Sequence, residues 1–162
     1  MMLPKIPQEL TDFKPEIGLI LGSGLGFFAD DRIEVVGRLP YGDIEGFPVS
    51  TVQGHVGQFV YGTIEGKRVI CMQGRFHFYE GYTMSEVTLP ICAMHQMGVR
   101  TLFVTNAAGG INLDYLPGNF MLLSDHINGL GTNPLIAWKG TEGVQFPDMT
   151  EGYNGELRAK IR

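Results

Sequence analysis

The amino-acid sequence predicts an α/β protein with a three-layer α/β/α arrangement, in which helices cover both faces of a central mixed, largely parallel sheet. Short apolar runs of strand length recur along the chain, and an amphipathic helical segment lies between two of them. Loops rich in glycine and other small residues follow several of these runs. Because ligands bind at the carboxyl ends of the strands in open α/β sheets, we expect a ligand site where these loops meet.

Length and composition restrict the class of protein. The 162 residues are enough for a single domain over residues 1–162, and 44% hydrophobic with 18% charged residues indicate a globular chain. The net charge of −5 argues against a nucleic-acid-binding surface. No apolar run is long enough to cross a membrane, and the first residues do not resemble a signal peptide. Cys71 and Cys92 lack metal-type spacing, so we expect reduced core residues in a cytoplasmic protein.

In the first half of the chain, apolar runs bounded by turn residues predict four strands. Residues 1–16 are expected to form a tethered leader that ends at Pro15. Glu65 and Gly66 predict the turn of a hairpin. The expected strands are residues 17–21, 33–39, 58–64 and 67–72, and a short helix is expected to open within residues 25–29.

The second half begins with a strong helix signal. Thr83-Met84-Ser85-Glu86 has the form of a capping box and predicts a helix that runs to about Met97, with Gly98 ending it. Pro90 removes one backbone hydrogen bond and is expected to kink or tighten this helix. A buried strand over residues 100–105, a short strand over 119–123 and a helix from residue 153 are expected to follow.

The loop of residues 74–82 contains two glycines and holds one arginine, one histidine, one carboxylate and four aromatic rings. Arg75 and His77 are two residues apart, so in an extended chain their side chains lie on the same side. A guanidinium beside an imidazole is a suitable pair of donors for an anion. The alternative is a surface loop whose aromatic rings fold back onto the core, and the loop by itself does not decide between the two.

Further donors follow other strands. Ser23 lies in a glycine-rich turn, His55 lies between two glycines, and Ala107 lies among tiny residues that expose backbone amides. Each segment has a structural alternative, a glycine-rich turn or a surface histidine. The turn at Ser23 is neither a dinucleotide fingerprint, since Phe27 replaces the third glycine, nor a P-loop. Several donors without an acidic cluster favour a phosphate rather than a metal, which indicates a phosphate-binding α/β enzyme.

Six motifs in order resemble the trimeric class of purine nucleoside phosphorylases, over about residues 17–153. They are Gly22-Ser23-Gly24-Leu25-Gly26, Gly54-His55-Val56-Gly57, residues 74–82, Thr105-Asn106-Ala107-Ala108-Gly109-Gly110, Ser124-Asp125-His126-Ile127-Asn128 and Asn133-Pro134-Leu135. The resemblance implies a phosphorylase-like fold and the phosphorolysis of purine nucleosides of the inosine and guanosine type to the purine and ribose 1-phosphate. Two alternatives stay open: an enzyme similar to 5′-methylthioadenosine phosphorylases, and a truncated fragment that only binds phosphate.

The resemblance also implies roles for individual residues. The phosphate contacts fall on Ser23, His55, Arg75 and the amide of Ala107, with His77 at the boundary between phosphate and ribose. Arg75 and His77 are the expected catalytic residues. The expected substrate contacts are Tyr79, Asn106, Ala107, Ala108 and Phe146. Phe76 and Phe78 are interpreted as packing residues, and Glu80 receives no role.

Assembly and completeness follow from the same resemblance. A homotrimer is implied, in which Phe146 reaches the ribose site of the neighbouring subunit. Inorganic phosphate is the implied co-substrate, with no cofactor, no metal, no nucleic acid and no membrane partner. The domain is expected to be incomplete at its C-terminus, with the base-reading residues beyond Arg162.

Overall fold

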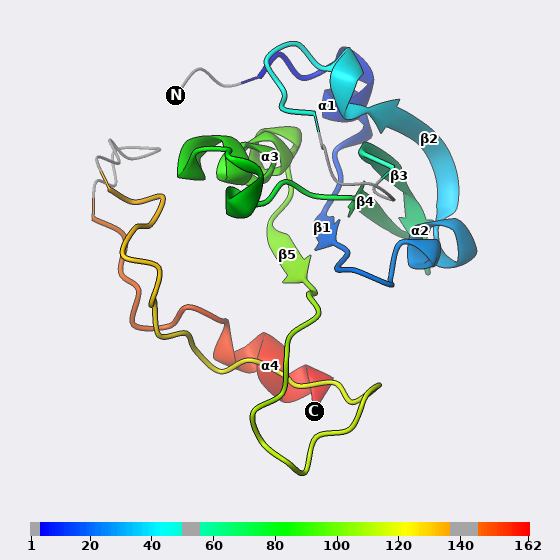
Figure 1. Cartoon of the computed structure of the whole chain (residues 1–162). Helices are drawn as coiled ribbons and strands as arrows, with labels where there is room; N and C mark the ends of the chain where they lie inside the picture. Colours follow the sequence, from blue (N-terminus) through cyan, green and yellow to red (C-terminus); the bar gives the residue numbers. More distant parts are fainter. Residues whose placement is uncertain (1–3, 50–55, 137–145) are drawn as a thin grey trace. The chain divides into compact units, whose positions relative to one another are not determined.

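The computed structural model describes residues 4–49, 56–136 and 146–162. The chain divides into two compact units, Met1–Ala108 and Gly109–Arg162, which are described separately (Figure 1). Within the described residues, no helix is long and apolar enough to cross a membrane.

The first unit is built on a five-stranded sheet in the order β2-β3-β4-β1-β5. The strands are β1 (Ile17–Ile20), β2 (Glu34–Pro40), β3 (Gln58–Ile64), β4 (Lys67–Gln73) and β5 (Thr101–Val104). β1 pairs in parallel with both β4 and β5, whereas β2–β3 and β3–β4 are antiparallel. The mixed sheet predicted from the sequence is therefore confirmed, and its parallel part is centred on β1.

The hairpin of β3 and β4 forms where the sequence predicts it. Glu65 and Gly66 have φ angles of 48° and 75°. Two successive positive φ angles give a turn whose twist matches that of the strands it joins. Glycine adopts this conformation readily, whereas glutamate does so at a steric cost.

Among the described residues of the first unit, three helices and two short 3-10 turns accompany the sheet. They are α1 (Gln8–Phe13), α2 (Phe27–Arg32), η1 (Tyr41–Asp43), η2 (Phe78–Glu80) and α3 (Met84–Met97). The capping box of α3 is present, because the Glu86 amide donates to the Thr83 hydroxyl and the Glu86 carboxylate accepts from the Thr83 amide. Gly98 ends the helix with a φ of 111°, and Pro90 lies buried inside it.

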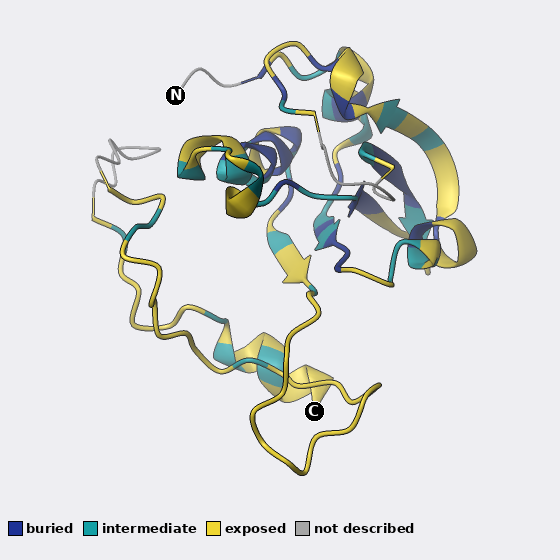
Figure 2. Ribbon diagram, in the orientation of Figure 1, coloured by how far each residue is buried: buried dark blue, intermediate teal, exposed yellow. Residues whose placement is uncertain are grey.

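The core fills both faces of the sheet (Figure 2). Along β4, Ile70 and Met72 belong to one apolar cluster and Val69 and Cys71 to the other, as the alternation of side chains along a strand requires. The first cluster includes buried residues of α1 and α3, and the second includes Ala29 of α2. Helices therefore cover both faces, which confirms the α/β/α layering.

Residues 1–16 are not simply a leader, and that prediction is wrong where the structure describes them. They contain α1, and Leu10 in this helix is fully buried against the first core cluster. Phe13 packs edge-on against Tyr61 of β3, with 5.1 Å between the ring centroids. Two apolar side chains three residues apart share one face of a helix, which gives α1 a surface to bury.

The expected burial of residues 100–105 is also wrong. β5 lies at the edge of the described sheet, and Leu102, Phe103 and Val104 are 38%, 44% and 52% exposed (Figure 2). An edge strand has a neighbour on one side only, so an apolar sequence does not by itself guarantee burial.

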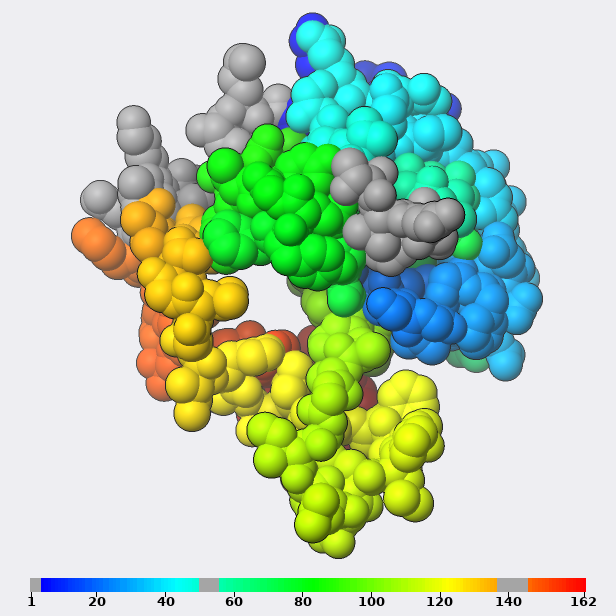
Figure 3. Space-filling model, in the orientation of Figure 1, coloured from blue at the N-terminus to red at the C-terminus, as the bar shows by residue number. Residues whose placement is uncertain are grey.

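Where the structure describes it, the second unit consists mainly of irregular chain and α4 (Gly155–Ile161) (Figure 1). In Figure 3 its atoms are coloured from yellow-green to red. Asn154 caps α4 by accepting a hydrogen bond from the Leu157 amide at 2.8 Å, which confirms the helix predicted at this end. The strand predicted over residues 119–123 does not form. Phe120 is 90% exposed, and within the described residues this segment pairs with no other strand, so its apolar sequence has nothing to pack against.

Candidate functional site

The carboxyl ends of three neighbouring parallel strands place the predicted loops at one edge of the sheet. Ser23 follows β1, Arg75 follows β4, and residues 106–108 follow β5. Thr105 joins the three strand ends. Its hydroxyl donates to the Ile20 carbonyl at 3.1 Å and accepts from the Gly22 amide at 2.8 Å, while its carbonyl accepts from Arg75. The structure therefore brings these loops together, as the sequence predicts.

Gly22 shows how closely two of these loops approach. A Cβ atom at this position would lie 2.6 Å from the Cα of Asn106 and 2.9 Å from the Thr105 carbonyl oxygen. Both are backbone atoms, so they cannot yield as the end of a flexible side chain can. Glycine at position 22 is thus required for the contact between the first loop and the chain that follows β5.

Arg75 is held by two hydrogen bonds. Its Nε donates to His77 Nε2 at 3.2 Å, and its Nη1 donates to the Thr105 carbonyl at 2.9 Å. Among the described residues, Nη2 has no hydrogen-bond partner. The contact confirms that Arg75 and His77 lie on the same side of the loop. A guanidinium fixed at two of its nitrogens presents the third in a defined direction, which suits the binding of an oxyanion.

His77 is oriented by Glu80, a residue that received no role in the sequence analysis. One carboxylate oxygen of Glu80 accepts from the His77 backbone amide at 2.8 Å and contacts the ring Nδ1 at 2.7 Å. Because the Arg75 Nε–H donates to Nε2, Nε2 is the acceptor and Nδ1 is the donor to Glu80. The Glu80 side chain is only 3% exposed. Glu80 occupies the capping-box position three residues after the N-cap residue, but that residue is His77 rather than the Ser or Thr of the sequence signature.

The aromatic rings of this loop divide into two groups. Phe76 is buried and packs against Tyr41, Phe47 and Tyr82, which confirms its interpretation as a packing residue. Phe78 is 47% exposed, so the same interpretation is wrong for it; it lies in the 3-10 turn η2 rather than in a strand facing the core. Tyr79 is 77% exposed, and its ring stacks on His77 with 4.7 Å between the ring centroids. The alternative in which the rings fold back onto the core thus holds for Phe76 but not for Phe78 or Tyr79.

The remaining predicted residues are exposed or lie elsewhere. Ser23 is exposed, as are residues 106–108, where the Asn106 side-chain amide donates to the Ala107 carbonyl at 3.0 Å. His55 lies outside the described residues. Phe146 belongs to the second unit and is 85% exposed. Their predicted roles in substrate binding stay predictions.

A polar cluster beneath the first loop was not predicted from the sequence. The Arg38 guanidinium donates to Asp30 at 2.7 Å, and Gln73 donates to the other oxygen of the same carboxylate at 3.0 Å. The pKa of Asp30 is lowered, mainly by the hydrogen bond from Arg38 and secondly by the hydrogen bond from Gln73. Nothing in the local pattern connects these residues, since they come from α2, β2 and β4.

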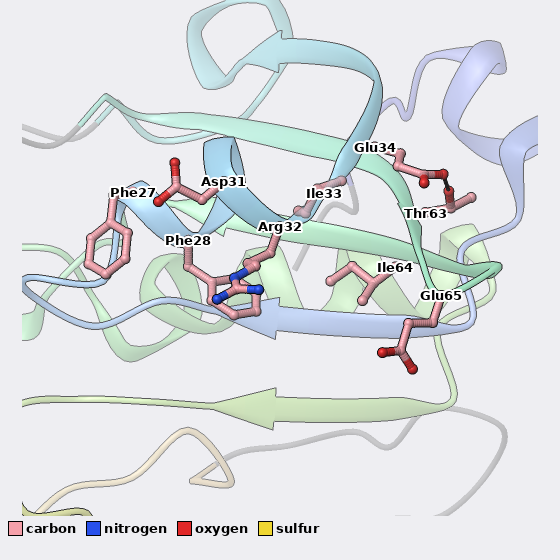
Figure 4. Close-up of a pocket in the computed structure, with 9 residues that line it drawn as sticks. All are labelled: Phe27, Phe28, Asp31, Arg32, Ile33, Glu34, Thr63, Ile64 and Glu65. Atoms are coloured by element: carbon pink, nitrogen blue, oxygen red, sulfur yellow. Dashed lines mark hydrogen bonds between the residues drawn. The ribbon is translucent and has the colours of Figure 1, made fainter.

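An open hollow between α2 and the β3–β4 turn lies apart from these loops (Figure 4). Asp31, Glu34 and Glu65 line it together with Arg32, and none of the predicted site residues does. Three carboxylates against one guanidinium do not suit an anion. The candidate site is therefore the loop edge around Arg75 rather than this hollow.

Comparison with known proteins agrees with this geometry. The chain matches the model of the phosphorylase superfamily over residues 16–162. It is 57% identical to purine nucleoside phosphorylase 1 of Geobacillus stearothermophilus over 152 residues, which cover 93% of this chain and 55% of the relative.

Solved structures show the same likeness. A Schistosoma mansoni purine nucleoside phosphorylase bound to a monocyclic inhibitor superposes with a TM-score of 0.81 at 44% identity, covering 94% of this chain and 57% of that one. The S. mansoni enzyme in complex with inosine gives 0.79 at 42% identity, covering 94% and 54%. The chain thus spans about half the length of the relatives it matches. The family model, the sequence identity and the shared fold together show that the chain belongs to the phosphorylase superfamily.

Proposed function

We propose that the chain forms the phosphate-binding part of a purine nucleoside phosphorylase, which converts a purine nucleoside and inorganic phosphate into the purine and ribose 1-phosphate. The observation that carries the proposal is the Arg75 guanidinium, fixed by His77 and the Thr105 carbonyl with Nη2 left for an anion. The names of the relatives, and the inosine complex of the S. mansoni enzyme, support purine nucleosides as the substrate class.

The proposed mechanism is mainly electrostatic placement. As the bond between the sugar C1′ and the purine nitrogen breaks, positive charge develops on the sugar and the purine leaves with the bonding electrons. A phosphate held by Arg75, the Ser23 hydroxyl and the Ala107 amide stabilises this charge and then forms the new C1′–O bond. Holding the nucleophile in place removes the entropic cost of its encounter with the sugar.

His77 and Tyr79 are proposed to border the ribose. Their stacked rings form a single unit, and the Glu80 hydrogen bonds fix its orientation. An exposed aromatic face beside the phosphate donors is suited to the apolar side of a sugar. His55 is proposed to add a phosphate donor, and Asn106 and Ala108 to line the floor of the site.

We further propose that the active form is a cytoplasmic homotrimer, which uses phosphate as co-substrate and needs no cofactor. Phe146 of one subunit would complete the ribose site of its neighbour. Its ring is 85% exposed, and a large exposed aromatic side chain is a suitable anchor for a contact between subunits.

The test combines binding and turnover. Phosphate binding to the 162-residue chain is measured by calorimetry, and the release of hypoxanthine from inosine by absorbance. Arg75→Ala is expected to weaken phosphate binding, or phosphorolysis where it occurs, on the order of 100-fold with an unchanged melting temperature. Arg32→Ala, an exposed arginine in the separate hollow, is the matched control and is expected to have no effect.

Three outcomes would change the proposal. Absence of both saturable phosphate binding and phosphate-dependent hypoxanthine release would overturn it. Equal effects of the two arginine variants would remove Arg75 from the site. Turnover of methylthioadenosine in preference to inosine would move the chain to the related methylthioadenosine branch.

A further inference from the structure

Gln73 is the last residue of β4 and directly precedes the loop that carries Arg75. It is a polar residue that is only 5% exposed. Burying an amide is costly unless its donors and acceptor are satisfied. An apolar side chain of similar size would avoid that cost, so the contacts of Gln73 indicate what its amide group does.

The side chain of Gln73 uses both of its amide hydrogens. Nε2 donates to the Gly26 carbonyl at 2.9 Å and to Asp30 Oδ2 at 3.0 Å, while Oε1 accepts from Gln58 Nε2 at 2.7 Å. A carbonyl and a carboxylate only accept, so these partners fix which end of the amide faces them. Asp30 is in turn held by Arg38 at 2.7 Å. The orientation of Gln73 is thus determined from three sides.

These contacts hold the C-terminal end of the loop of residues 22–26, so that the loop is attached at both of its ends. At its first end, the Gly22 amide donates to the Thr105 hydroxyl, which follows β5. At its second end, the Gly26 carbonyl accepts from Gln73 at the end of β4. Because β4 and β5 flank β1, the loop after β1 is held from both neighbouring strands, with Ser23 between the two attachments.

The backbone of Gln73 adds a connection to another segment. Its carbonyl accepts from the Gly57 amide at 3.0 Å, and the carbonyl of the next residue, Gly74, accepts from the buried Tyr41 hydroxyl at 2.7 Å. The chain that enters the Arg75 loop is therefore fixed at two consecutive carbonyls, while the Gln73 side chain holds the Ser23 loop.

We infer that Gln73 is a positioning residue for the phosphate site, which sets the placement of the Ser23 loop relative to Arg75. The inference rests on the proposed function and adds to it a residue that touches no substrate. A displacement of the Gly26 end moves the Ser23 hydroxyl and the nearby amides away from an anion bound by Arg75. Phosphate affinity should therefore depend on Gln73 more strongly than nucleoside affinity or thermal stability does.

The test compares Gln73→Met with Gln58→Met. The first variant keeps the length of the side chain and removes the bond to Gly26, whereas the second removes only the bond to Oε1 and leaves the Gly26 contact in place. Calorimetry with inorganic phosphate and with inosine gives the two affinities. Gln73→Met is expected to weaken phosphate binding about tenfold, the equivalent of roughly one hydrogen bond, with a much smaller change for inosine. Gln58→Met is expected to bind phosphate normally.

Amide hydrogen exchange supplies a readout that does not need phosphate. The Leu25 amide, which donates to the Gly22 carbonyl at 3.1 Å, should exchange faster in Gln73→Met, while amides of the β3–β4 hairpin keep their protection. Gln73→Glu tests the same point if the methionine variant does not fold, because it keeps the shape and places a second acceptor against Gly26 and Asp30.

The outcomes separate this inference from the proposed function. If the unmodified chain binds phosphate and the Gln73 variants bind it equally well, the positioning role is wrong and the proposed function stands. Equal losses in Gln73→Met and Gln58→Met would also overturn it, since the Gly26 contact would then be irrelevant. If the unmodified chain shows neither phosphate binding nor phosphorolysis, the proposed function fails and the inference fails with it.

Discussion

At the scale of single residues, the orientation of His77 depends on a carboxylate that is almost fully shielded from solvent. Glu80 contacts both the backbone amide and the ring Nδ1 of His77. Glu80→Ala removes both contacts, so we expect weaker phosphate binding and a changed Nδ1 resonance in the nitrogen NMR spectrum of the ring, while the Arg75 contact keeps Nε2 as the acceptor. Glu80→Gln keeps an acceptor oxygen and should retain both properties. An Nδ1 resonance that is the same in all three proteins would contradict this role.

The buried thiol of Cys71 gives a second prediction at this scale. The pKa of Cys71 is raised from 9.0 to about 12, mainly because burial removes the thiol from water. The unfolded thiol loses its proton near its ordinary pKa, while the folded thiol keeps it. The contribution of Cys71 to stability is therefore complete below pH 9 and is lost as the pH rises toward 12.

Urea unfolding at a series of pH values measures this effect. The free energy of unfolding should decrease from pH 9 upward, and Cys71→Ala should make that decrease shallower while lowering stability below pH 9. Burial also raises the pKa of Tyr41, so part of the slope should remain in the variant. An identical slope in both proteins would exclude a contribution from Cys71.

At the scale of elements, the capping box of α3 is a local feature, and its removal should lower stability through the start of this helix alone. Thr83→Ala removes the hydroxyl that accepts from the Glu86 amide, and we expect it to lower the free energy of unfolding by about 1 kcal/mol. Ser85→Ala changes an exposed serine in the same turn and serves as the control. Thermal unfolding of the two variants measures the difference, and equal melting temperatures would show that the cap is not used.

The elements that the sequence predicts correctly are those whose signals are local. Glu65 and Gly66 specify a turn, and Thr83 with Glu86 specifies a helix start, within a few residues. The exposure of β5 and the absence of a strand over residues 119–123 depend instead on whether a distant part of the chain covers an apolar run. Gln73 was missed for the same reason, because its partners are 15 to 47 residues away.

The candidate site shows the same division. The side shared by Arg75 and His77 follows from a spacing of two residues, and the meeting of the loops follows from parallel strands. The role of Thr105, which connects three strand ends, could not be predicted from the sequence because it depends on the strand order β4-β1-β5. Sequence patterns therefore indicated which loops meet at the candidate site, while the sheet determines how they are held.

At the scale of the whole molecule, β5 leaves an apolar edge in contact with water. Leu102, Phe103 and Val104 are all exposed, and the outer side of β5 has no partner strand among the described residues. Exposed backbone donors and acceptors beside apolar side chains favour pairing with another strand. We therefore expect the chain to associate with itself as its concentration rises.

Sedimentation at several concentrations tests this expectation. Phe103→Lys places a charge on the β5 edge and should shift the distribution toward the monomer. Phe27→Lys is the matched control, because Phe27 is a comparably exposed aromatic residue that lies on α2 and not on a strand edge. Two outcomes would contradict the role of β5: an unmodified chain that is monomeric at all concentrations, or a defined trimer that Phe103→Lys leaves intact. The second would instead agree with an assembly formed through another surface, as the proposed contact at Phe146 requires.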